Sequence, residues 1–312
     1  MNFRNLCILT ALVLAAGALA GCVSNNGGAG GEKLQQAGSS TVFPIAAAWA
    51  EALAPGLQVT VAGGGSGAGA SKLCAKEIDI GTMSRPFKDS EKATCASNGV
   101  TATEWPVAYD GLTVVVAKSN AFIDHLTVDE LKHIWRANDP ARTWADVRAG
   151  WPAERIVLYG PDSDSGTYEY FNEEILGKNC GADGKSICPP RSDYTASADD
   201  NRLVHGVVAS PHAIGHFGFS YFHENQNDLK AVPIVPPGGS TPVAPTFETI
   251  ADGSYKPLAR PLFMVTNGVP ASGTPLHEYL SYAFGDGQKL VRSVGYVELD
   301  AAKLAEMKGR LG

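Results

Sequence analysis

Three short segments rich in Gly, Ser and Thr each come directly before a stretch with the pattern of a helix. They are residues 38–41 (Gly-Ser-Ser-Thr), 65–67 (Gly-Ser-Gly) and 164–167 (Asp-Ser-Gly-Thr). The N-terminus of a helix leaves backbone N–H groups without partners and carries partial positive charge, so a turn of small residues there can bind an anion. One such turn would be an ordinary helix cap. Three of them predict that several helix ends converge on a tetrahedral oxyanion.

The second and third turns each allow another interpretation. The glycines of residues 63–69 let a backbone approach a ligand closely, but they have neither the phosphate-loop nor the dinucleotide-binding spacing, and a flexible surface loop is the alternative. Residues 162–167 also fit a helix that is merely capped by acidic and hydroxyl side chains. A hydrolase with Ser165 or Ser66 as nucleophile is a weaker hypothesis, because the Gly-x-Ser-x-Gly elbow is absent and no His is placed as the base.

Two charged residues have sequence positions that suit an anion site. Arg85 follows an expected strand at 78–82 and precedes Pro86, which keeps it extended. Its guanidinium suits a charge-assisted contact to an oxyanion, although an isolated Arg is more often simply solvated. Asp110 stands just before Gly111 and a buried strand. It fits either a turn residue or an acceptor for the proton of a protonated oxyanion.

The N-terminus predicts export. Arg4, an apolar stretch at 7–14 and a small-residue exit make residues 1–21 a signal peptide, and the apolar stretch is too short for a membrane span. Residues 19–22 (Leu-Ala-Gly-Cys) resemble the lipobox of bacterial lipoproteins, so Cys22 is predicted to carry a lipid; the alternative is a plain signal peptide with an incidental Cys. Residues 22–33 fit a flexible tether. We therefore expect a membrane-anchored protein on the periplasmic or cell-surface side.

Four further cysteines agree with export. An even number of Cys in an exported protein predicts disulfides. Pairing of neighbours, Cys74 with Cys95 and Cys180 with Cys188, is favoured among three possible connectivities. A metal site is the rival interpretation, but the spacings lack the Cys-x-x-Cys pattern of zinc sites. No metal and no cofactor are expected.

Composition and periodicity bound the class of the protein. The 312 residues carry a formal net charge of −7 with no run of Lys and Arg, so a nucleic-acid partner is not expected. Short β-rich runs alternate with helical stretches, which predicts an α/β fold with a largely parallel sheet. Thr127 is the expected cap of one helix, with Glu130 in the capping-box position.

The elements expected after residue 57 follow from these patterns. We expect strands at 58–62, 78–82, 112–117, 156–159, 216–222, 231–235 and 260–266. We expect helices at 70–78, 127–135, 275–293 (interrupted near 285–287) and 301–308. Residues 236–256, rich in Pro, Gly, Ser and Thr, are expected to be a surface loop.

From residue 38 to its end the chain resembles the phosphate-binding proteins of bacterial phosphate ABC transporters (PstS-like, type II periplasmic-binding proteins). Each motif alone is loose, and their order and spacing together are specific. The segments that carry the resemblance are 37–44 (Ala-Gly-Ser-Ser-Thr-Val-Phe-Pro), 64–69 (Gly-Gly-Ser-Gly-Ala-Gly), 78–86 (Ile-Asp-Ile-Gly-Thr-Met-Ser-Arg-Pro), 109–116 (Tyr-Asp-Gly-Leu-Thr-Val-Val-Val), 164–167 (Asp-Ser-Gly-Thr) and 287–297.

The resemblance implies a two-lobed α/β fold in which each lobe is a mostly parallel sheet flanked by helices. Lobe I would comprise 34–113 and 262–312, and lobe II 114–261. It implies a monomeric receptor, not an enzyme, that captures inorganic phosphate between the lobes, closes by a hinge and delivers the ion to ABC transporter permease subunits.

The resemblance also implies the residues of the site. Ser40 and Thr41 match the first anion-binding turn and Ser66 the second. A third turn from the opposite lobe is matched by Ser165, Gly166 and Thr167.

The best-known members of the family have a charge pair that this chain lacks. Their Asp after the strand at 78–82 is replaced here by Ser84, and their Arg before the third turn by Gly160 and Pro161. We therefore expect Arg85 to supply the positive charge and Asp110 to accept the proton of phosphate. The acceptor matters because phosphate at neutral pH carries a proton and sulfate does not. Bound sulfate would therefore leave the buried acceptor without a hydrogen-bond donor, which would weaken sulfate binding.

Other functions are weighed against this one. The first is a receptor for another tetrahedral oxyanion such as sulfate. The second is the phosphate-ester hydrolase. The third is an adhesion or structural lipoprotein that has kept the fold without transport.

Overall fold

The computed structural model describes residues 33–163, 165–178, 180 and 186–312. The predicted signal peptide, the lipidation site Cys22, the tether up to residue 32 and Asp164 of the third turn lie outside the described residues. The described residues all belong to one compact unit.

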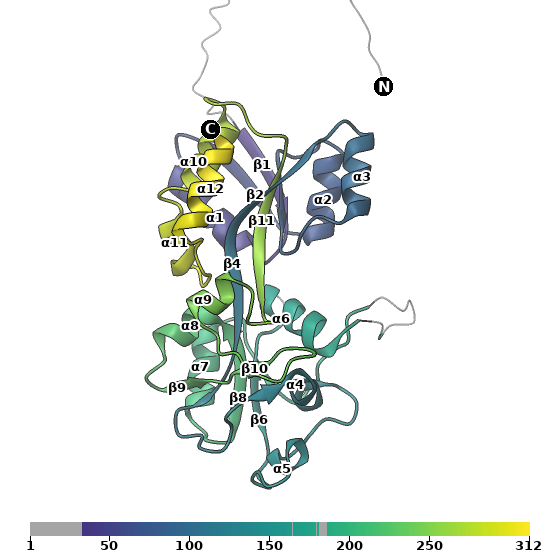
Figure 1. The fold of residues 1–312 in the computed structure, drawn as a ribbon, viewed down its shortest axis with the longest axis vertical. Coiled ribbons are helices and arrows are strands. Elements are labelled where there is room, and N and C mark those ends of the chain that lie inside the picture. Colours follow the sequence, from purple (N-terminus) through teal and green to yellow (C-terminus); the bar gives the residue numbers. More distant parts are fainter. Residues whose placement is uncertain (1–32, 164, 179, 181–185) are drawn as a thin grey trace, which may run out of the picture. The chain divides into compact units, whose positions relative to one another are not determined.

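One large sheet runs through this unit (Figure 1). Its strands lie in the order β2 (Gln58–Ala62), β1 (Lys33–Gly38), β3 (Ile80–Met83), β11 (Ala259–Asn267), β4 (Ala102–Ala117), β8 (Ala213–Gly218), β6 (Val157–Gly160) and β7 (Thr195–Ala196), with β9 (Leu229–Ala231) also on β4. A small separate sheet pairs β5 (Leu126–Thr127) with β10 (Ile234–Val235).

Parallel pairs occupy the two ends of the large sheet and antiparallel pairs its centre. β1 runs parallel to β2 and β3, and β6 runs parallel to β7 and β8. In the centre, β3–β11, β11–β4, β4–β8 and β4–β9 are antiparallel. The α/β class is confirmed, but the sheet is less parallel than expected. The reason is that β4 and β11 run in opposite directions at the centre of the sheet, and each of the four antiparallel pairs includes one or both of these strands.

β4 is longer than the sequence pattern predicts, which was a strand at 112–117. Its residues Ala102 to Gly111 pair with β11, and those from Leu112 onward pair with β8 and β9. The early part was missed because it contains Pro106, which lies next to a break in the β4–β11 register. The predicted lobe boundaries stay a prediction; β4 changes partner strand between Gly111 and Leu112.

Twelve α-helices and one π-helix are formed by the described residues. They are α1 (Phe43–Leu53), α2 (Ser66–Cys74), α3 (Asp89–Ser97), α4 (Val128–Trp135), α5 (Trp144–Val147), α6 (Gly166–Phe171), η1 (Asn172–Leu176), α7 (Asp200–Val208), α8 (Phe219–Glu224), α9 (Phe247–Ala251), α10 (Pro275–Ala283), α11 (Gln288–Ser293) and α12 (Ala301–Leu311). Within the described ranges, none of these helices has the length and apolar character needed to span a bilayer.

Several local predictions are confirmed and two are wrong. The capping box of α4 is present: the Thr127 N–H donates to Glu130 Oε2 at 2.8 Å, and the Glu130 N–H donates to Thr127 Oγ1 at 3.1 Å. The predicted interruption near 285–287 separates α10 from α11. The predicted strand at 216–222 is wrong after Gly218, because the aromatic residues that follow form α8. The predicted loop at 236–256 contains α9, which Thr246 caps.

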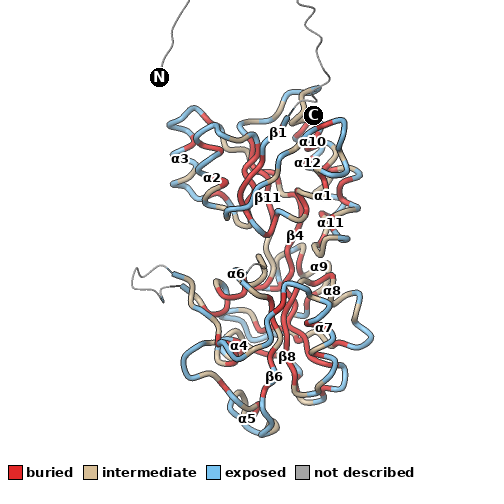
Figure 2. Tube along the Cα trace, turned by 180° about the vertical axis from the view of Figure 1, so that it is seen from behind, coloured by how far each residue is buried: buried red, intermediate tan, exposed pale blue. Residues whose placement is uncertain are grey.

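Buried side chains follow the central strands (Figure 2). Every residue of β4 from Val107 to its end is buried. Four fully buried Trp residues contribute to the main core: Trp49, Trp105, Trp135 and Trp144. A smaller core lies around the contact of α2 with α3.

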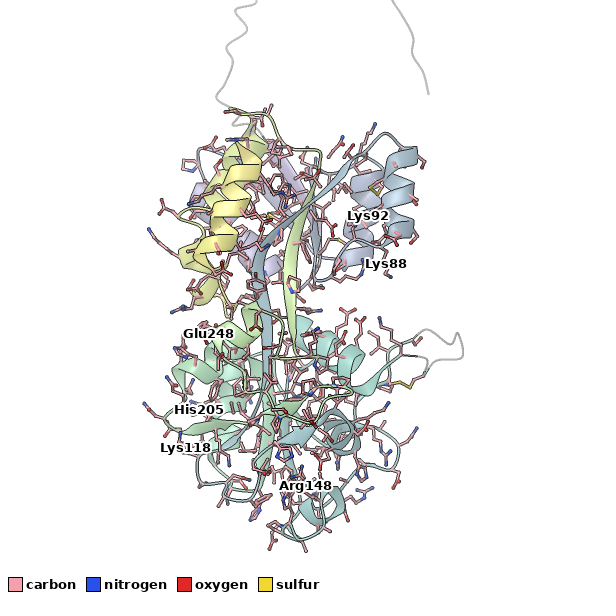
Figure 3. The ribbon with its side chains drawn as sticks, viewed as in Figure 1. Lys88, Lys92, Lys118, Arg148, His205 and Glu248 are labelled. Atoms are coloured by element: carbon pink, nitrogen blue, oxygen red, sulfur yellow. A yellow bond between two sulfur atoms is a disulfide. The ribbon has the colours of Figure 1, made fainter. Side chains whose placement is uncertain are left out.

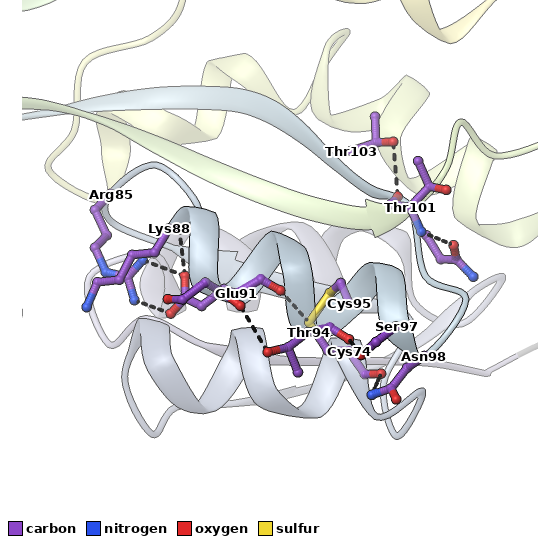
Figure 4. The surroundings of a disulfide bond; sticks show 12 residues. Cys74, Arg85, Lys88, Glu91, Thr94, Cys95, Ser97, Asn98, Thr101 and Thr103 are labelled. Atoms are coloured by element: carbon purple, nitrogen blue, oxygen red, sulfur yellow. Dashed lines mark hydrogen bonds and ion pairs between the residues drawn. A yellow bond between two sulfur atoms is a disulfide. The ribbon is translucent and has the colours of Figure 1, made fainter.

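Both predicted disulfides are present. Cys74 of α2 is bonded to Cys95 of α3 (Figure 4), and Cys180 is bonded to Cys188. Neighbour pairing is therefore confirmed, and the rival metal site is wrong because all four thiols are used.

Candidate functional site

The first turn lies between the end of β1 and α1. Gly38 has φ +143°, and a Cβ there would fall 2.2 Å from the Thr82 carbonyl oxygen, so only glycine lets β1 approach β3 this closely. The Ser39 N–H donates to the same carbonyl at 2.9 Å. Ser39 Oγ accepts from the N–H groups of Thr41 and Val42 at 3.2 and 3.4 Å. The turn is thus held rigidly with Ser40 and Thr41 at its tip.

The second turn is tied to the first through its backbone. The Gly65 N–H donates to the Gly38 carbonyl at 2.8 Å, and α2 begins at the next residue, Ser66. Ser66 Oγ accepts from the Ser84 N–H at 3.1 Å and lies 3.2 Å from Ser84 Oγ. Ser84 therefore contacts the second turn directly.

The third turn is in contact with the first. Ser165 caps α6, with its Oγ accepting the Thr167 N–H at 3.2 Å. A Cβ on Gly166 would fall 2.6 Å from Thr41 Oγ1, so this approach also requires glycine. The prediction that all three turns open helices is confirmed.

Two cavities lie against these turns. The larger, of about 960 Å³, is lined by residues of all three turns, among them Thr41, Ser66 and Gly166. The smaller, of about 390 Å³, is lined by Ser40 and by all three described residues of the third turn, Ser165, Gly166 and Thr167. The structure therefore brings the three predicted turns together.

Arg85 lines the larger cavity, but its charge is matched within the protein (Figure 4). Its Nη1 and Nη2 donate to the two carboxylate oxygens of Glu91 at 2.9 and 2.7 Å, and Nη1 also donates to the Pro86 carbonyl at 3.0 Å. Burial raises the pKa of Glu91, but the bonds from Arg85 and from the Lys88 N–H outweigh it, so the pKa is lowered. This bidentate pair fixes Arg85 at the start of α3.

A different arginine, Arg260 of β11, stands at the first turn. Its Nη2 donates to Thr41 Oγ1 at 3.0 Å, and its Nε and Nη2 both donate to Asp110 Oδ2 at 3.1 Å. The guanidinium carbon lies 3.6 Å from the ring centroid of Tyr170, a cation–π contact. The Tyr170 hydroxyl in turn donates to the Pro257 carbonyl at 2.7 Å.

Asp110 lies behind Arg260 and not at the cavity. The two residues are cross-strand partners on β4 and β11, and their side chains are 6% and 15% exposed. Among the described residues that line the larger cavity, Arg260 is present and Asp110 is not. Burial raises the pKa of Asp110, while the charge and hydrogen bonds of Arg260 oppose the rise. The structure therefore shows Asp110 as the residue that holds Arg260.

Sequence reasoning missed Arg260 and Tyr170. The available signal was that Arg260 precedes Pro261 as Arg85 precedes Pro86. The decisive information, the register that places Arg260 opposite Asp110, is not in any local pattern. In the described part of the chain, no three His, Cys, Asp or Glu side chains gather in a way that could hold a metal ion.

Comparison with known proteins gives the family. Residues 23–286 match a family model that is described as the PBP superfamily domain. The chain is 40% identical over 269 residues to the protein SphX of Synechococcus elongatus, covering 85% of this chain and 77% of that protein. It is 34% identical over 304 residues to the phosphate-binding protein PstS of Staphylococcus saprophyticus, covering 96% of this chain and 90% of that protein.

A solved structure agrees with the sequence comparisons. The crystal structure of a possible phosphate binding protein from Planctomyces limnophilus has a TM-score of 0.82 and 41% identity, covering 90% of this chain and 98% of that one. The mixed α/β fold and the order of the three turns fit the same group. The chain therefore belongs to the PBP superfamily and, within it, to the PstS-like phosphate-binding proteins.

Proposed function

We propose that this protein is the substrate-binding component of a phosphate ABC transporter, which captures inorganic phosphate and delivers it to the permease subunits. The observation that carries the proposal is that three turns opening helices line adjoining cavities, with Arg260 bonded to the first of them. The relatives named above as phosphate-binding proteins support it.

The proposed contacts to the ion are hydrogen bonds and one positive charge. Backbone N–H groups of the turns, with the hydroxyls of Ser40, Thr41 and Ser66, donate from one side. The third turn donates from the other side through Ser165 and Thr167, and Gly166 allows the close approach. These contacts would join the two lobes, so we propose that the ion stabilises closure about β4 and β11.

We propose that Arg260, rather than Arg85, supplies the positive charge. Both residues line the cavity and each is paired with a carboxylate, but of the two only Arg260 also donates to a residue of one of the turns. Asp110 acts as the positioning residue that orients Arg260. The further expectation that Asp110 accepts the proton of phosphate stays a prediction.

Location and partners complete the proposal. We propose that the protein is exported, anchored by a lipid on Cys22 to the periplasmic or cell-surface side, and monomeric. Two disulfides agree with an oxidising compartment. Mass spectrometry of the mature N-terminus, and loss of membrane association in Cys22→Ala, test the anchor.

Calorimetric titration of the purified protein with phosphate and with sulfate tests the function. We expect phosphate to bind with a dissociation constant on the order of micromolar or tighter. Failure of both ions to bind would overturn the receptor hypothesis. Preference for sulfate would support the alternative oxyanion receptor. Asp110→Asn that keeps phosphate affinity and gains no sulfate binding would reject Asp110 as acceptor.

A further inference from the structure

The larger cavity has charged residues on two separate parts of its wall. One part is the segment 84–88, which follows β3, and the other is the face of α6 and η1, which follow β6. In the large sheet, β3 and β6 are separated by β11, β4 and β8. The two parts of the wall therefore belong to different halves of the sheet, and bending of β4 and β11 would change the distance between them.

The segment 84–88 carries one cation without a carboxylate partner. Arg85 is bonded to Glu91 through both of its terminal nitrogens. Lys88 (Figure 3) contacts Glu91 through its backbone N–H, which donates at 2.9 Å. Lys88 is exposed, and its ammonium forms no ion pair with any described residue. This ammonium is therefore available to a carboxylate from another element.

The face of α6 and η1 carries one carboxylate without a cation partner. Three glutamates of this face line the cavity: Glu169, Glu173 and Glu174. Glu173 forms an ion pair with Lys178. Burial raises the pKa of Glu174, and the charge of Arg260 opposes the rise, so Glu174 is already under the influence of a cation. Glu169 is exposed and forms no ion pair with any residue that the structure describes.

Glu169 lies at the border of the cavity that is farther from β11. Tyr170, about 100° further round the helix, contacts Arg260 of β11. Glu169 also lines a separate cavity of about 280 Å³, together with Ile187 and Pro189. Its side chain leans toward the start of α6, because Cα–Cβ bonds in a helix tilt toward the N-terminus. The Glu169 carboxylate is thus near the third turn without being one of the proposed donors to the ion.

We infer that Lys88 and Glu169 form an ion pair across the cavity when the protein closes around phosphate, and that this pair stabilises the closed state. The inference rests on the proposed phosphate site and on the proposed closure about β4 and β11. Because the two residues are not paired in this structure, their attraction would favour the closed state alone and slow the release of phosphate.

The sign of a single substitution separates this ion pair from simple repulsion. A carboxylate near an anion site repels the anion, so neutralising it would by itself strengthen phosphate binding. We expect the reverse: Glu169→Gln should weaken phosphate binding about two- to fivefold, as for loss of an exposed ion pair, and Lys88→Gln should do the same. Calorimetric titration of the protein, freed of bound phosphate, measures both.

The outcomes of this titration are distinct. If the wild type binds phosphate and Glu169→Gln binds it equally well or more tightly, the inference is overturned and the proposed function stands. If the wild type does not bind phosphate, the proposed function itself fails.

Lys256 provides the matched control, since it also is exposed, lines the cavity and forms no ion pair with the described residues. It precedes Pro257, whose carbonyl accepts the Tyr170 hydroxyl, so it lies on the Tyr170 side of α6 and away from Glu169. Whatever Lys256→Gln does alone, its effect should add to that of Glu169→Gln within about twofold.

The double variant Lys88→Gln/Glu169→Gln should instead lose no more phosphate affinity than either single variant, because the first substitution already breaks the pair. Effects of Lys88→Gln and Glu169→Gln that add as those of the Lys256 control do would overturn the inference.

A charge swap repeats the test without removing the pair. Lys88→Glu places a carboxylate opposite Glu169 and should weaken phosphate binding about tenfold. Lys88→Glu/Glu169→Lys restores opposite charges and should bind phosphate within about twofold of the wild type. Stopped-flow measurement of phosphate release should show the same loss and recovery. A swap that recovers none of the affinity lost in Lys88→Glu would overturn the pairing.

Discussion

The guanidinium of Arg260 lies 3.6 Å from the ring centroid of Tyr170. Arg260 belongs to β11, whereas Tyr170 belongs to α6, the helix that the third turn opens. Because Arg260 also donates to Thr41 of the first turn and to Asp110 of β4, one side chain connects four elements around the proposed phosphate site. A cation held this way is costly to remove, since its buried carboxylate partner Asp110 would be left unpaired.

Replacing Arg260 should weaken phosphate binding more than replacing Arg85. We expect Arg260→Ala to lower affinity about 10–100-fold, because a charge-assisted contact contributes about 1.5–3 kcal/mol. Arg85→Ala should lower it by less than about threefold, because the hydrogen bonds of Arg85 go to Glu91 and Pro86, whereas Arg260 donates to Thr41 of the first turn. Calorimetric titration of both variants measures the difference. The opposite ranking would restore Arg85 as the source of charge.

The hydroxyl of Tyr170 should contribute to stability, and its ring should contribute to phosphate affinity. Tyr170→Phe keeps the ring under Arg260 and removes only the hydrogen bond to the Pro257 carbonyl, at a cost of about 1 kcal/mol in stability. Tyr170→Leu also removes the cation–π contact and should weaken phosphate binding several-fold further. Thermal unfolding and titration of the pair separate these effects. Equal phosphate affinities in the two variants would show that the ring does not orient Arg260.

Gly166 and Gly67 provide a matched pair of glycine substitutions, since both line the larger cavity at the start of a helix. Gly166→Ala would place a Cβ 2.6 Å from Thr41 Oγ1, so one of the two turns must move. We expect at least about a tenfold loss of phosphate affinity. A Cβ on Gly67 would meet nothing within 4 Å, so Gly67→Ala should bind normally. Normal phosphate binding by Gly166→Ala would show that this contact is not part of the closed site.

The disulfide between Cys74 and Cys95 should contribute mainly to stability. It closes a loop with a sequence separation of 21, and the chain-entropy relation gives about 3 kcal/mol. Thermal and denaturant unfolding of the double variant Cys74→Ala/Cys95→Ala measures this. Because both sulfurs are buried, mild reductant should leave the native protein's affinity unchanged. Rapid loss of phosphate binding under reductant would contradict the burial of these two sulfurs and their purely stabilising role.

Local patterns predicted the turns and caps well, but long-range pairing could not be read from them. The three turns, the Thr127 cap and the neighbour disulfides depend on residues close in sequence. The pairing of Arg260 with Asp110 depends on the register of two strands 150 residues apart. Arg85 was favoured because its motif is local, yet Glu91, six residues later, is the residue that binds it. Local patterns thus predicted the three turns but neither the pairing of Arg85 with Glu91 nor that of Arg260 with Asp110.

Asp200 at the start of α7 should make the protein less stable as the pH rises. Burial raises the pKa of its carboxyl to about 7; the backbone hydrogen bond from Gly218 opposes the rise, and the charge of Asp199 adds to it. In the unfolded chain an Asp releases its proton near pH 3.9. Between about pH 4 and pH 7 the folded state therefore holds one proton more than the unfolded state, so this group's stabilising contribution declines with rising pH and is lost above about pH 7.

Asp200→Asn should remove that decline, because an amide does not titrate and still accepts the Gly218 N–H. We expect the variant to unfold at a higher temperature than the wild type at pH 8 and at nearly the same temperature at pH 4. Asp286→Asn is the control, since Asp286 is fully exposed and its hydrogen bond with Lys289 lowers its pKa. Scanning calorimetry from pH 4 to pH 8 gives both curves. If the unfolding temperature of Asp200→Asn fell with rising pH as steeply as that of the wild type, the Asp200 carboxylate would be solvated and another group would cause the pH dependence.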